Sequence, residues 1–205
     1  NILWGRQYYF IRDEFYGAKT HVFENHVNAL LITFGGTDQH DLTRKILFGI
    51  LPYCERSSIK IFVVTGSGYM YLNELKEEVS KLLDSNIEVT HATGVMSRIM
   101  EKTSIAITSN GRTVYELAHM SIPAIVIPVN EREKTHEFAC EKNGFISLNG
   151  FRDKETPNEV LNALKKLVEN TRYRKTLHQN TVPFNFTYNK KNILKRIEKL
   201  LQKEK

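Results

Sequence analysis

The segment IAITSNGRTVYELAHMSIPAIVIP, residues 105–128, decides the fold of this chain. It contains an apolar β-branched run, a small polar turn at Ser109-Asn110-Gly111, a short helical stretch and a second apolar run. A strand that enters a helix through such a turn leaves backbone N–H groups unpaired where the helix begins, and these groups attract phosphate. Glu116 follows one turn later, where a carboxylate can accept hydrogen bonds from ribose hydroxyls. The segment therefore predicts a nucleotide site, although the helix dipole alone also favours an acidic first turn.

The alternation of strand and helix patterns continues along most of the chain. Apolar runs predict six strands, at residues 29–34, 59–65, 87–90, 105–108, 124–129 and 145–148. Helical periodicity predicts helices at residues 41–54, 72–83, 95–100, 114–119, 133–142, 157–169 and 192–201. Several strands are apolar on both faces, which is typical of a parallel sheet covered by helices on both sides. We expect an α/β fold with a doubly wound parallel sheet of about six strands.

Three parts of different character are expected along the chain. Residues 1–28 show no clean period and predict a linker from a missing N-terminal domain. Residues 29–188 predict a Rossmann-like domain, and residues 189–205 a basic amphipathic helix. An apolar stripe predicts that this last helix packs back on the domain, through Ile193, Leu194, Ile197, Leu200 and Leu201.

The positive charge of the chain is concentrated at its end. Residues 189–205 carry seven Lys or Arg and two Glu, a net charge of +5 out of +6 for the whole chain. The nearly neutral remainder argues against a nucleic-acid-binding surface, whereas a weak membrane-surface contact of the tail stays open. No apolar run reaches the roughly 20 residues of a transmembrane helix, and no signal peptide is recognised, so we expect a cytoplasmic protein. Cys54 and Cys140 are expected to be free thiols, with a single disulfide as the alternative.

Ligands of doubly wound sheets bind at the carboxyl ends of the strands. The loops to consider are therefore residues 35–38, 66–68, 91–95, 108–112 and 130–134. Gly35 and Gly36 permit close backbone approach to a ligand, and Thr37 or Asp38 can cap the next helix. The Gly66-Ser67-Gly68 loop lacks the third glycine of a dinucleotide fingerprint and predicts only a tight turn.

Several chemistries lack their motif in this sequence. No Gly-x-Ser-x-Gly elbow and no Gly-Lys-Ser/Thr loop are present, and His136 with Cys140 lacks a third metal ligand. No metal site and no cofactor are expected. An NAD-type domain is disfavoured because Thr65-Gly66 stands where an acidic residue belongs. The sequence thus offers a binding site without an evident catalytic set.

Three segments resemble the nucleotide-binding C-terminal half of GT-B fold proteins. They are GRQYYFIRDEF (residues 5–15), LLITFGGTDQHDLTRKIL (residues 30–47) and SNGRTVYELAHMSIPAIVIPVNEREKTHEFA (residues 109–139). The similar families are the peptidoglycan N-acetylglucosaminyltransferase, the UDP-sugar hydrolase of pseudaminic acid biosynthesis and spore-coat polysaccharide proteins. The first two segments look more like the hydrolase branch. The resemblance implies a UDP-sugar ligand and catalytic groups on an N-terminal domain of the same protein.

The resemblance also implies roles for individual residues. Glu116 would bind the ribose hydroxyls, and Val95 and Met96 would border the uracil. Thr135-His136 stands where the transferase type has two glutamines, which puts hexosamine specificity and transferase activity in doubt. The remaining implied contacts to phosphate or sugar are Gly35, Gly36, Thr37, Asn110, Gly111, Arg112, Thr113, Asn130, Thr135 and His136.

Arg112 and the neighbouring backbone amides would stabilise a departing nucleoside diphosphate without a metal. On this interpretation the chain binds nucleotide but lacks the half that activates the nucleophile. The alternative hypothesis is a non-enzymatic interaction module that holds a partner through its basic tail.

Overall fold

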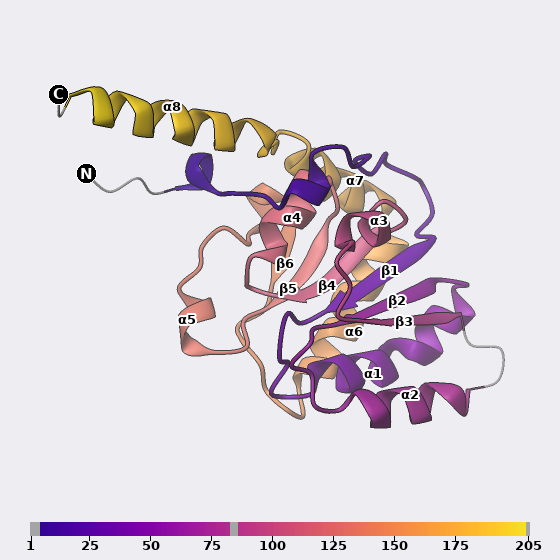
Figure 1. Cartoon of the computed structure of the whole chain (residues 1–205). Coiled ribbons are helices and arrows are strands. Elements are labelled where there is room, and N and C mark those ends of the chain that lie inside the picture. The colour runs from indigo at the N-terminus through magenta and orange to yellow at the C-terminus, as the bar shows by residue number, and fades with distance from the viewer. Residues whose placement is uncertain (1–4, 83–85, 204–205) are drawn as a thin grey trace.

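A parallel sheet of six strands forms the centre of the molecule (Figure 1). The computed structural model describes residues 5–82 and 86–203. The strands lie in the order β3-β2-β1-β4-β5-β6, and every neighbouring pair is parallel. They are β1 (Ala29–Thr33), β2 (Lys60–Thr65), β3 (Ile87–His91), β4 (Ile105–Ser109), β5 (Ala124–Ile127) and β6 (Phe145–Ser147). The predicted α/β fold with a doubly wound sheet is confirmed.

Helices cover both faces of this sheet (Figure 1). They are α1 (Leu42–Arg56), α2 (Leu72–Ser80), α3 (Met96–Met100), α4 (Thr113–His119), α5 (Glu131–Lys134), α6 (Thr156–Glu169), α7 (Thr171–Thr181) and α8 (Thr187–Lys203). Leu30 and Ile32 of β1 belong to the core shared with α1, α2 and α6, whereas Leu31 belongs to the core shared with α3 and α4. All three side chains are fully buried, as expected for a strand covered on both faces.

The side on which new strands are added to the sheet changes between β1 and β4. After β1 the chain builds β2 and β3 on one side, and it then crosses to β4 on the other side of β1. Helix α1 packs on one face of the sheet and α4 on the opposite face. In such folds this divergence opens a crevice at the carboxyl ends of the two central strands. The turns after β1 and β4 are thus the place where the fold favours a ligand.

Residues 5–28, which we name the N-terminal segment, pack closely on the domain although they show no regular period. The segment contains only two short 3₁₀ helices, η1 (Arg6–Tyr8) and η2 (Asp13–Phe15). Ile11 and Phe15 are buried in the core beside α4, and the ring of Tyr9 stacks on that of Tyr115 at 4.4 Å. Residues 1–4 of the predicted linker lie outside the described residues.

The helix predicted at residues 133–142 is wrong. The structure has the one-turn α5 there, an irregular stretch, and the 3₁₀ helix η3 (Glu141–Asn143), which ends at Gly144 with a φ of 94°. The side-chain amide of Asn110 explains the interruption, because its Nδ2 donates to the carbonyls of Glu133 and His136, both at 2.9 Å. A continuous helix would use these two carbonyls for its own hydrogen bonds.

Helix α7 was not predicted, because its sequence is largely polar. Its inner face buries Leu177 together with three polar side chains, Arg174, His178 and Thr181. The Arg174 guanidinium donates to the last carbonyls of α6, those of Leu167 and Val168, and to the carbonyls of Glu24 and Asn25. Backbone carbonyls, rather than a carboxylate, therefore stabilise this buried charge.

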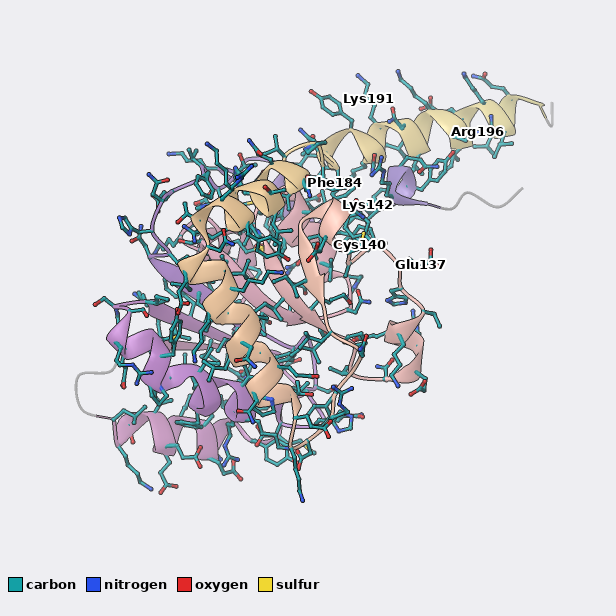
Figure 2. The ribbon with its side chains drawn as sticks, turned by 180° about the vertical axis from the view of Figure 1, so that it is seen from behind. Glu137, Cys140, Lys142, Phe184, Lys191 and Arg196 are labelled. Atoms are coloured by element: carbon teal, nitrogen blue, oxygen red, sulfur yellow. The ribbon has the colours of Figure 1, made fainter. Side chains whose placement is uncertain are left out.

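The prediction that the C-terminal helix packs back on the domain is confirmed only at the start of the helix. Helix α8 begins against the domain, where Ile193 is buried, and then extends away from it (Figures 1 and 2). Leu194, Ile197 and Leu201 are exposed. We name these three residues the free stripe of α8. Residues 204–205 lie outside the described residues, as does Leu83 of the helix predicted at 72–83.

Two smaller findings concern the remaining predictions. Within residues 5–82 and 86–203, no helix is long and apolar enough to cross a membrane. Cys54 is buried, Cys140 is partly buried, and both thiols are free, as predicted.

Candidate functional site

The turns after β1 and β2 touch each other through glycines. A Cβ atom at Gly66 would lie 2.4 Å from Cα of Gly36 and 2.5 Å from two carbonyl oxygens, so only glycine fits there. The amide of Gly68 donates to the carbonyl of Gly36 at 3.0 Å. The Gly66-Ser67-Gly68 loop is therefore a tight structural turn, as predicted, and it supports the Gly35–Gly36 turn from below.

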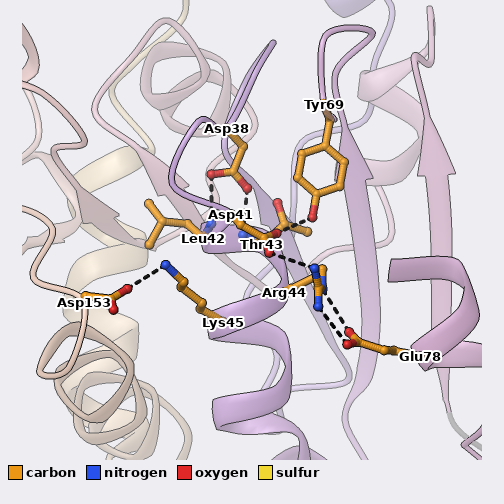
Figure 3. A network of polar contacts seen from close by, with 9 residues as sticks. All are labelled: Asp38, Asp41, Leu42, Thr43, Arg44, Lys45, Tyr69, Glu78 and Asp153. Carbon is orange, nitrogen blue, oxygen red and sulfur yellow. Dashed lines mark hydrogen bonds and ion pairs between the residues drawn. The ribbon is translucent and has the colours of Figure 1, made fainter. Parts of the chain in front are cut away.

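Asp38 fixes the path of the chain from β1 into α1 (Figure 3). Its buried carboxylate accepts hydrogen bonds from the amides of Leu42 at 2.9 Å and Thr43 at 2.8 Å, which confirms the predicted capping role. Asp38 and Asp41 adopt positive φ values of 40° and 51°, a backbone conformation that residues other than glycine rarely adopt. The capping bonds offset this strain and hold the turn in one shape.

A second set of contacts ties the start of α1 to α2 (Figure 3). The hydroxyl of Tyr69 donates to Asp41 at 2.6 Å, and Arg44 forms ion pairs with Asp41 at 3.1 Å and Glu78 at 2.7 Å. Burial and the nearby Asp41 carboxylate raise the pKa of Tyr69 far above its ordinary value, so the phenol stays protonated as a donor. These contacts hold the loop after β1 in a fixed position against α1 and α2.

A hollow of about 380 Å³ opens between the turns that follow β1 and β4. We name it the β1–β4 hollow. It is lined by Phe34, Gly35, Gly36, Thr37, Asp38, Gln39, His40, Ser109, Gly111, Arg112, Thr113, Val129, Asn130 and Glu133.

The turn after β4 presents open hydrogen-bond donors to this hollow. Within the described part of the chain, the backbone amides of Gly111, Arg112 and Thr113 donate to no other residue. The side chain of Arg112 is exposed beside them. The hydroxyl of Thr108, buried directly below the turn, also has no partner among the described residues. Unpaired amides next to a guanidinium are a typical environment for an anion.

Two carboxylates face the same hollow, and both already accept hydrogen bonds from backbone amides. Asp38 caps α1, and Oε2 of Glu133 accepts from the amides of Asn110 at 3.0 Å and Val129 at 3.1 Å. The amide of Glu133 in turn donates to the side chain of Asn130 at 2.9 Å. The β4 and β5 turns are thus cross-linked through Glu133, which leaves the Gly111–Thr113 amides as the open part of the turn.

A second hollow of about 370 Å³ continues the first toward β2 and β3. We name it the β1–β2 hollow. It shares Gly35, Gly36 and Thr113 with the β1–β4 hollow, so the two form one surface along the carboxyl ends of the strands. Its other lining residues are Arg12, Thr33, Val64, Thr65, Gly66, Ser67, Ala92, Thr93 and Met96.

Glu116 lies beneath this second hollow and does not line it. The residue is 4% exposed, and Arg12 covers it through two hydrogen bonds, Nε to Oε1 at 2.7 Å and Nη2 to Oε2 at 3.1 Å. Burial raises the pKa of Glu116 and the Arg12 pair lowers it, with burial the larger effect. Nη1 of Arg12 also pairs with Glu14 at 2.8 Å. The other oxygen of Glu14 accepts from the amide of Ser97 in α3 at 2.9 Å.

The structure brings most of the predicted site residues to the two hollows. Seven of them line the β1–β4 hollow, and Met96 lines the β1–β2 hollow. The seven are Gly35, Gly36, Thr37, Gly111, Arg112, Thr113 and Asn130.

The remaining predicted residues line neither hollow. Val95 is exposed beside Met96, Glu116 is covered by Arg12, and the buried Asn110 turns its side chain toward α5. Thr135 lines a separate hollow of about 780 Å³ beside Tyr9 and Tyr115. His136 is exposed and its Nδ1 lies 2.7 Å from the carbonyl of Asn110. Ligand contact by these residues stays a prediction.

Sequence reasoning did not assign roles to Arg12, Glu14 and Glu133. Arg12 and Glu14 precede the region of alternating strands and helices, and their position within GRQYYFIRDEF is the one sequence signal that indicates a role for them. Glu133 lies in the one-turn α5 instead of the longer helix predicted at residues 133–142. Within the described residues, no group of three or more His, Cys, Asp and Glu comes together as a metal site.

A cavity of about 650 Å³ lies at the opposite end of the sheet. It is bordered by the N-terminal segment at His21 and Phe23, by Ser121, which precedes β5, and by α7. Its position at the amino ends of the strands separates it from the crevice where doubly wound folds bind ligands.

Residues 29–200 match the glycosyltransferase family 28 C-terminal domain. The chain belongs to this family. An uncharacterized protein of Methanocaldococcus jannaschii is 30% identical over 136 residues, which are 64% of this chain and 28% of that protein. The chain therefore spans less than a third of the length of the curated relative that it matches.

Solved structures share the fold at low sequence identity. The UDP-GlcNAc 2-epimerase of Neisseria meningitidis, bound to UDP-GlcNAc, has a TM-score of 0.64 and 14% identity, covering 86% of this chain and 46% of that one. Anabaena HepE in complex with UDP and glucose has a TM-score of 0.62 and 12% identity, covering 83% and 48%. The C-terminal domain of the Francisella tularensis glycosyl transferase LpcC has a TM-score of 0.60 and 14% identity, covering 77% and 83%. The fold of this family 28 domain is thus that of the C-terminal half of GT-B proteins.

Proposed function

We propose that this domain binds a nucleoside diphosphate sugar, specifically a UDP-sugar, along the carboxyl ends of β1 and β4. The observation that carries the proposal is the β1–β4 hollow, where the open amides of Gly111, Arg112 and Thr113 face the glycine turn after β1. Similar structures support it, since proteins of this fold have been captured with UDP or UDP-GlcNAc.

The diphosphate is placed in the β1–β4 hollow because the positive groups lie there. Its oxygens accept from the Gly111–Thr113 amides and from the guanidinium of Arg112, which is exposed and free to turn. The glycine turn lets the phosphates approach the backbone closely. The uridine then extends along the β1–β2 hollow toward Met96, and the sugar extends toward Asn130.

The reaction class is either hydrolysis of the UDP-sugar or transfer of its sugar, in surface polysaccharide or nonulosonic acid biosynthesis. The domain contributes stabilisation of the departing diphosphate, because negative charge that develops on the β-phosphate meets oriented donors. The group that activates water or an acceptor hydroxyl belongs to an N-terminal domain of the same protein. Thr135-His136, in place of two glutamines, favours the hydrolase branch.

Isothermal titration calorimetry of the chain with UDP, UMP and uridine tests this proposal. We expect UDP to bind in the micromolar to millimolar range, UMP more weakly, and uridine weakest. Arg112→Ala should weaken UDP binding about tenfold, the scale of one hydrogen bond between charged groups, with little effect on uridine. Arg172→Ala, which removes an exposed arginine on α7, is the matched control. Absence of UDP binding, or equal affinity for UDP and uridine, would contradict the proposal.

A second candidate function is a non-catalytic interaction module, and one observation favours it. The free stripe of α8 is exposed next to basic residues such as Lys191 and Arg196 (Figure 2). Truncation after Ile193 separates the two functions, since it removes the free stripe but keeps Ile193 and Asn189 packed on the domain. Loss of a bound partner with unchanged UDP affinity would support the module, and loss of UDP binding would argue against it.

A further inference from the structure

Arg12, and not Glu116, is the charged group that the β1–β2 hollow presents to a ligand. Arg12 lines that hollow and its side chain is 45% exposed, whereas the Glu116 side chain is 6% exposed. Both oxygens of Glu116 accept hydrogen bonds from Arg12. A ribose in the hollow therefore meets the carboxylate only if the guanidinium moves.

The backbone around Arg12 is held in place, so this movement is confined to the side chain. Ile11 before it and Phe15 after it are buried in the core beside α4. Glu14 is tied to the start of α3 through the amide of Ser97. The carbonyl of Arg12 accepts from the amide of Phe15 at 3.1 Å, the guanidinium lies 5.3 Å from the centre of the Phe15 ring, and the side chain is 45% exposed. Rotation of its side-chain torsions is sufficient to uncover Glu116.

A ligand diol can replace the Arg12 guanidinium as the hydrogen-bond donor to Glu116. The carboxylate is buried and needs a hydrogen-bond donor, since a buried charge without a partner is strongly unfavourable. A vicinal diol offers two O–H donors with a similar spacing to the two N–H donors of Arg12. The diol and the guanidinium therefore compete for the same two oxygens.

We propose that Arg12 is a specificity-determining latch that withholds Glu116 from the ribose, so that the diol is recognised only after Arg12 has been displaced. The inference rests on the proposed nucleotide function and deepens it. In the isolated chain, the gain from the diol–carboxylate bonds is offset by loss of the Arg12–Glu116 bonds. Wild-type protein should then bind ribose and dideoxyribose nucleotides almost equally well.

Calorimetry with UDP and 2′,3′-dideoxyuridine diphosphate tests the latch. We expect wild-type protein to bind the two ligands within about twofold of each other. Arg12→Ala should prefer UDP by about tenfold, because the freed carboxylate then gains the diol without losing a partner. Asp13→Asn is the matched control: Asp13 lies next to Arg12, has an 81% exposed side chain and, among the residues that the structure describes, forms its ion pair with Lys190 on α8. This control should behave as wild type.

An NMR measurement on the wild-type chain covers the case in which Arg12→Ala unfolds. The Nε–H signal of Arg12, assigned by its loss in Arg12→Lys, reports the bond to Glu116. Addition of UDP should move this signal, and addition of the dideoxy ligand should leave it unchanged.

The outcomes separate the latch from the nucleotide function itself. If wild type and Arg12→Ala prefer UDP over the dideoxy ligand to the same extent, or if neither prefers UDP, the latch is overturned. The proposed function still stands in that case, provided that both proteins bind UDP. Loss of affinity for both ligands in Arg12→Ala also overturns it, because Arg12 would then be a direct phosphate or sugar contact. If no variant binds UDP, the proposed function fails and the latch fails with it.

Discussion

The N-terminal segment and α8 flank the same domain and behave in opposite ways. The segment has no hydrophobic period, but it inserts Ile11 and Phe15 into the core and places Arg12 on Glu116. Helix α8 has a regular apolar stripe, but Leu194, Ile197 and Leu201 remain exposed. Periodicity therefore predicts the conformation of a segment, whereas packing depends on whether the domain offers a complementary surface.

Phe15→Ala should destabilise the chain most. The side chain is fully buried between the segment and α4, so its loss leaves a cavity and should cost about 3–5 kcal/mol of unfolding free energy. Urea denaturation measures this value. If the cost is below about 1 kcal/mol, the typical scale for a weakly packed site, the segment is not part of the core.

Arg174→Met should have the next largest effect. The substitution leaves the carbonyls at the end of α6 and those of Glu24 and Asn25 without their donor, which we expect to cost about 2–3 kcal/mol. Arg172→Met, at an exposed position of the same helix, is the control and should change stability by less than about 0.5 kcal/mol. Urea denaturation of the pair measures both values, and equal stability of the two variants would argue that Arg174 does not hold the segment.

Arg12→Ala should make stability depend more steeply on pH. Burial already raises the pKa of Glu116, and removal of Arg12 raises it further because the lowering effect of the ion pair is lost. A carboxyl group with a raised pKa in the folded state favours folding below its unfolded pKa, and this contribution is lost as the pH rises through the folded value. The variant should therefore match wild type near pH 4 and lose about 2 kcal/mol by pH 7. Urea denaturation at both pH values measures this difference, and a deficit that is the same at both would show that Glu116 does not depend on Arg12.

Substitutions in the free stripe of α8 should have the smallest effect on stability. Leu201→Ser removes an exposed side chain and should change the unfolding free energy by less than about 0.5 kcal/mol. Ile193→Ser, in the same helix but buried, should cost about 1–2 kcal/mol. Thermal unfolding of both variants compares the two ends of α8. Similar losses would mean that the whole helix packs on the domain in solution.

The positions of the strands and the parallel, doubly wound type of the sheet follow from local sequence, and this part of the fold was predictable. Most strands are short apolar runs followed by a glycine or small polar turn, as at Thr33 to Gly36. The parallel sheet then places the turns after β1 and β4 at one edge, which is why most of the predicted site residues share a hollow.

The errors arose where side chains distant in sequence decide the local conformation. The Asn110 amide takes carbonyls that a helix after Glu133 needs, and the Arg174 charge binds carbonyls from two other segments. The Arg12–Glu116 pair joins residues more than one hundred positions apart. Helical and strand periods carry no information about such pairs, so the sequence located Glu116 correctly on α4 without indicating that it is covered.

The most direct test of the central claim is an NMR titration of the isotope-labelled chain with UDP, followed through its backbone amides. The account predicts that the amide signals of Gly36, Gly111, Arg112 and Thr113 shift with a common saturation curve, because these groups line the β1–β4 hollow. The signals of Gly144 and Gly150, which lie outside that hollow, should stay in place. Shifts confined to the cavity beside His21 and α7, with the Gly111–Thr113 amides unaffected, would contradict the account.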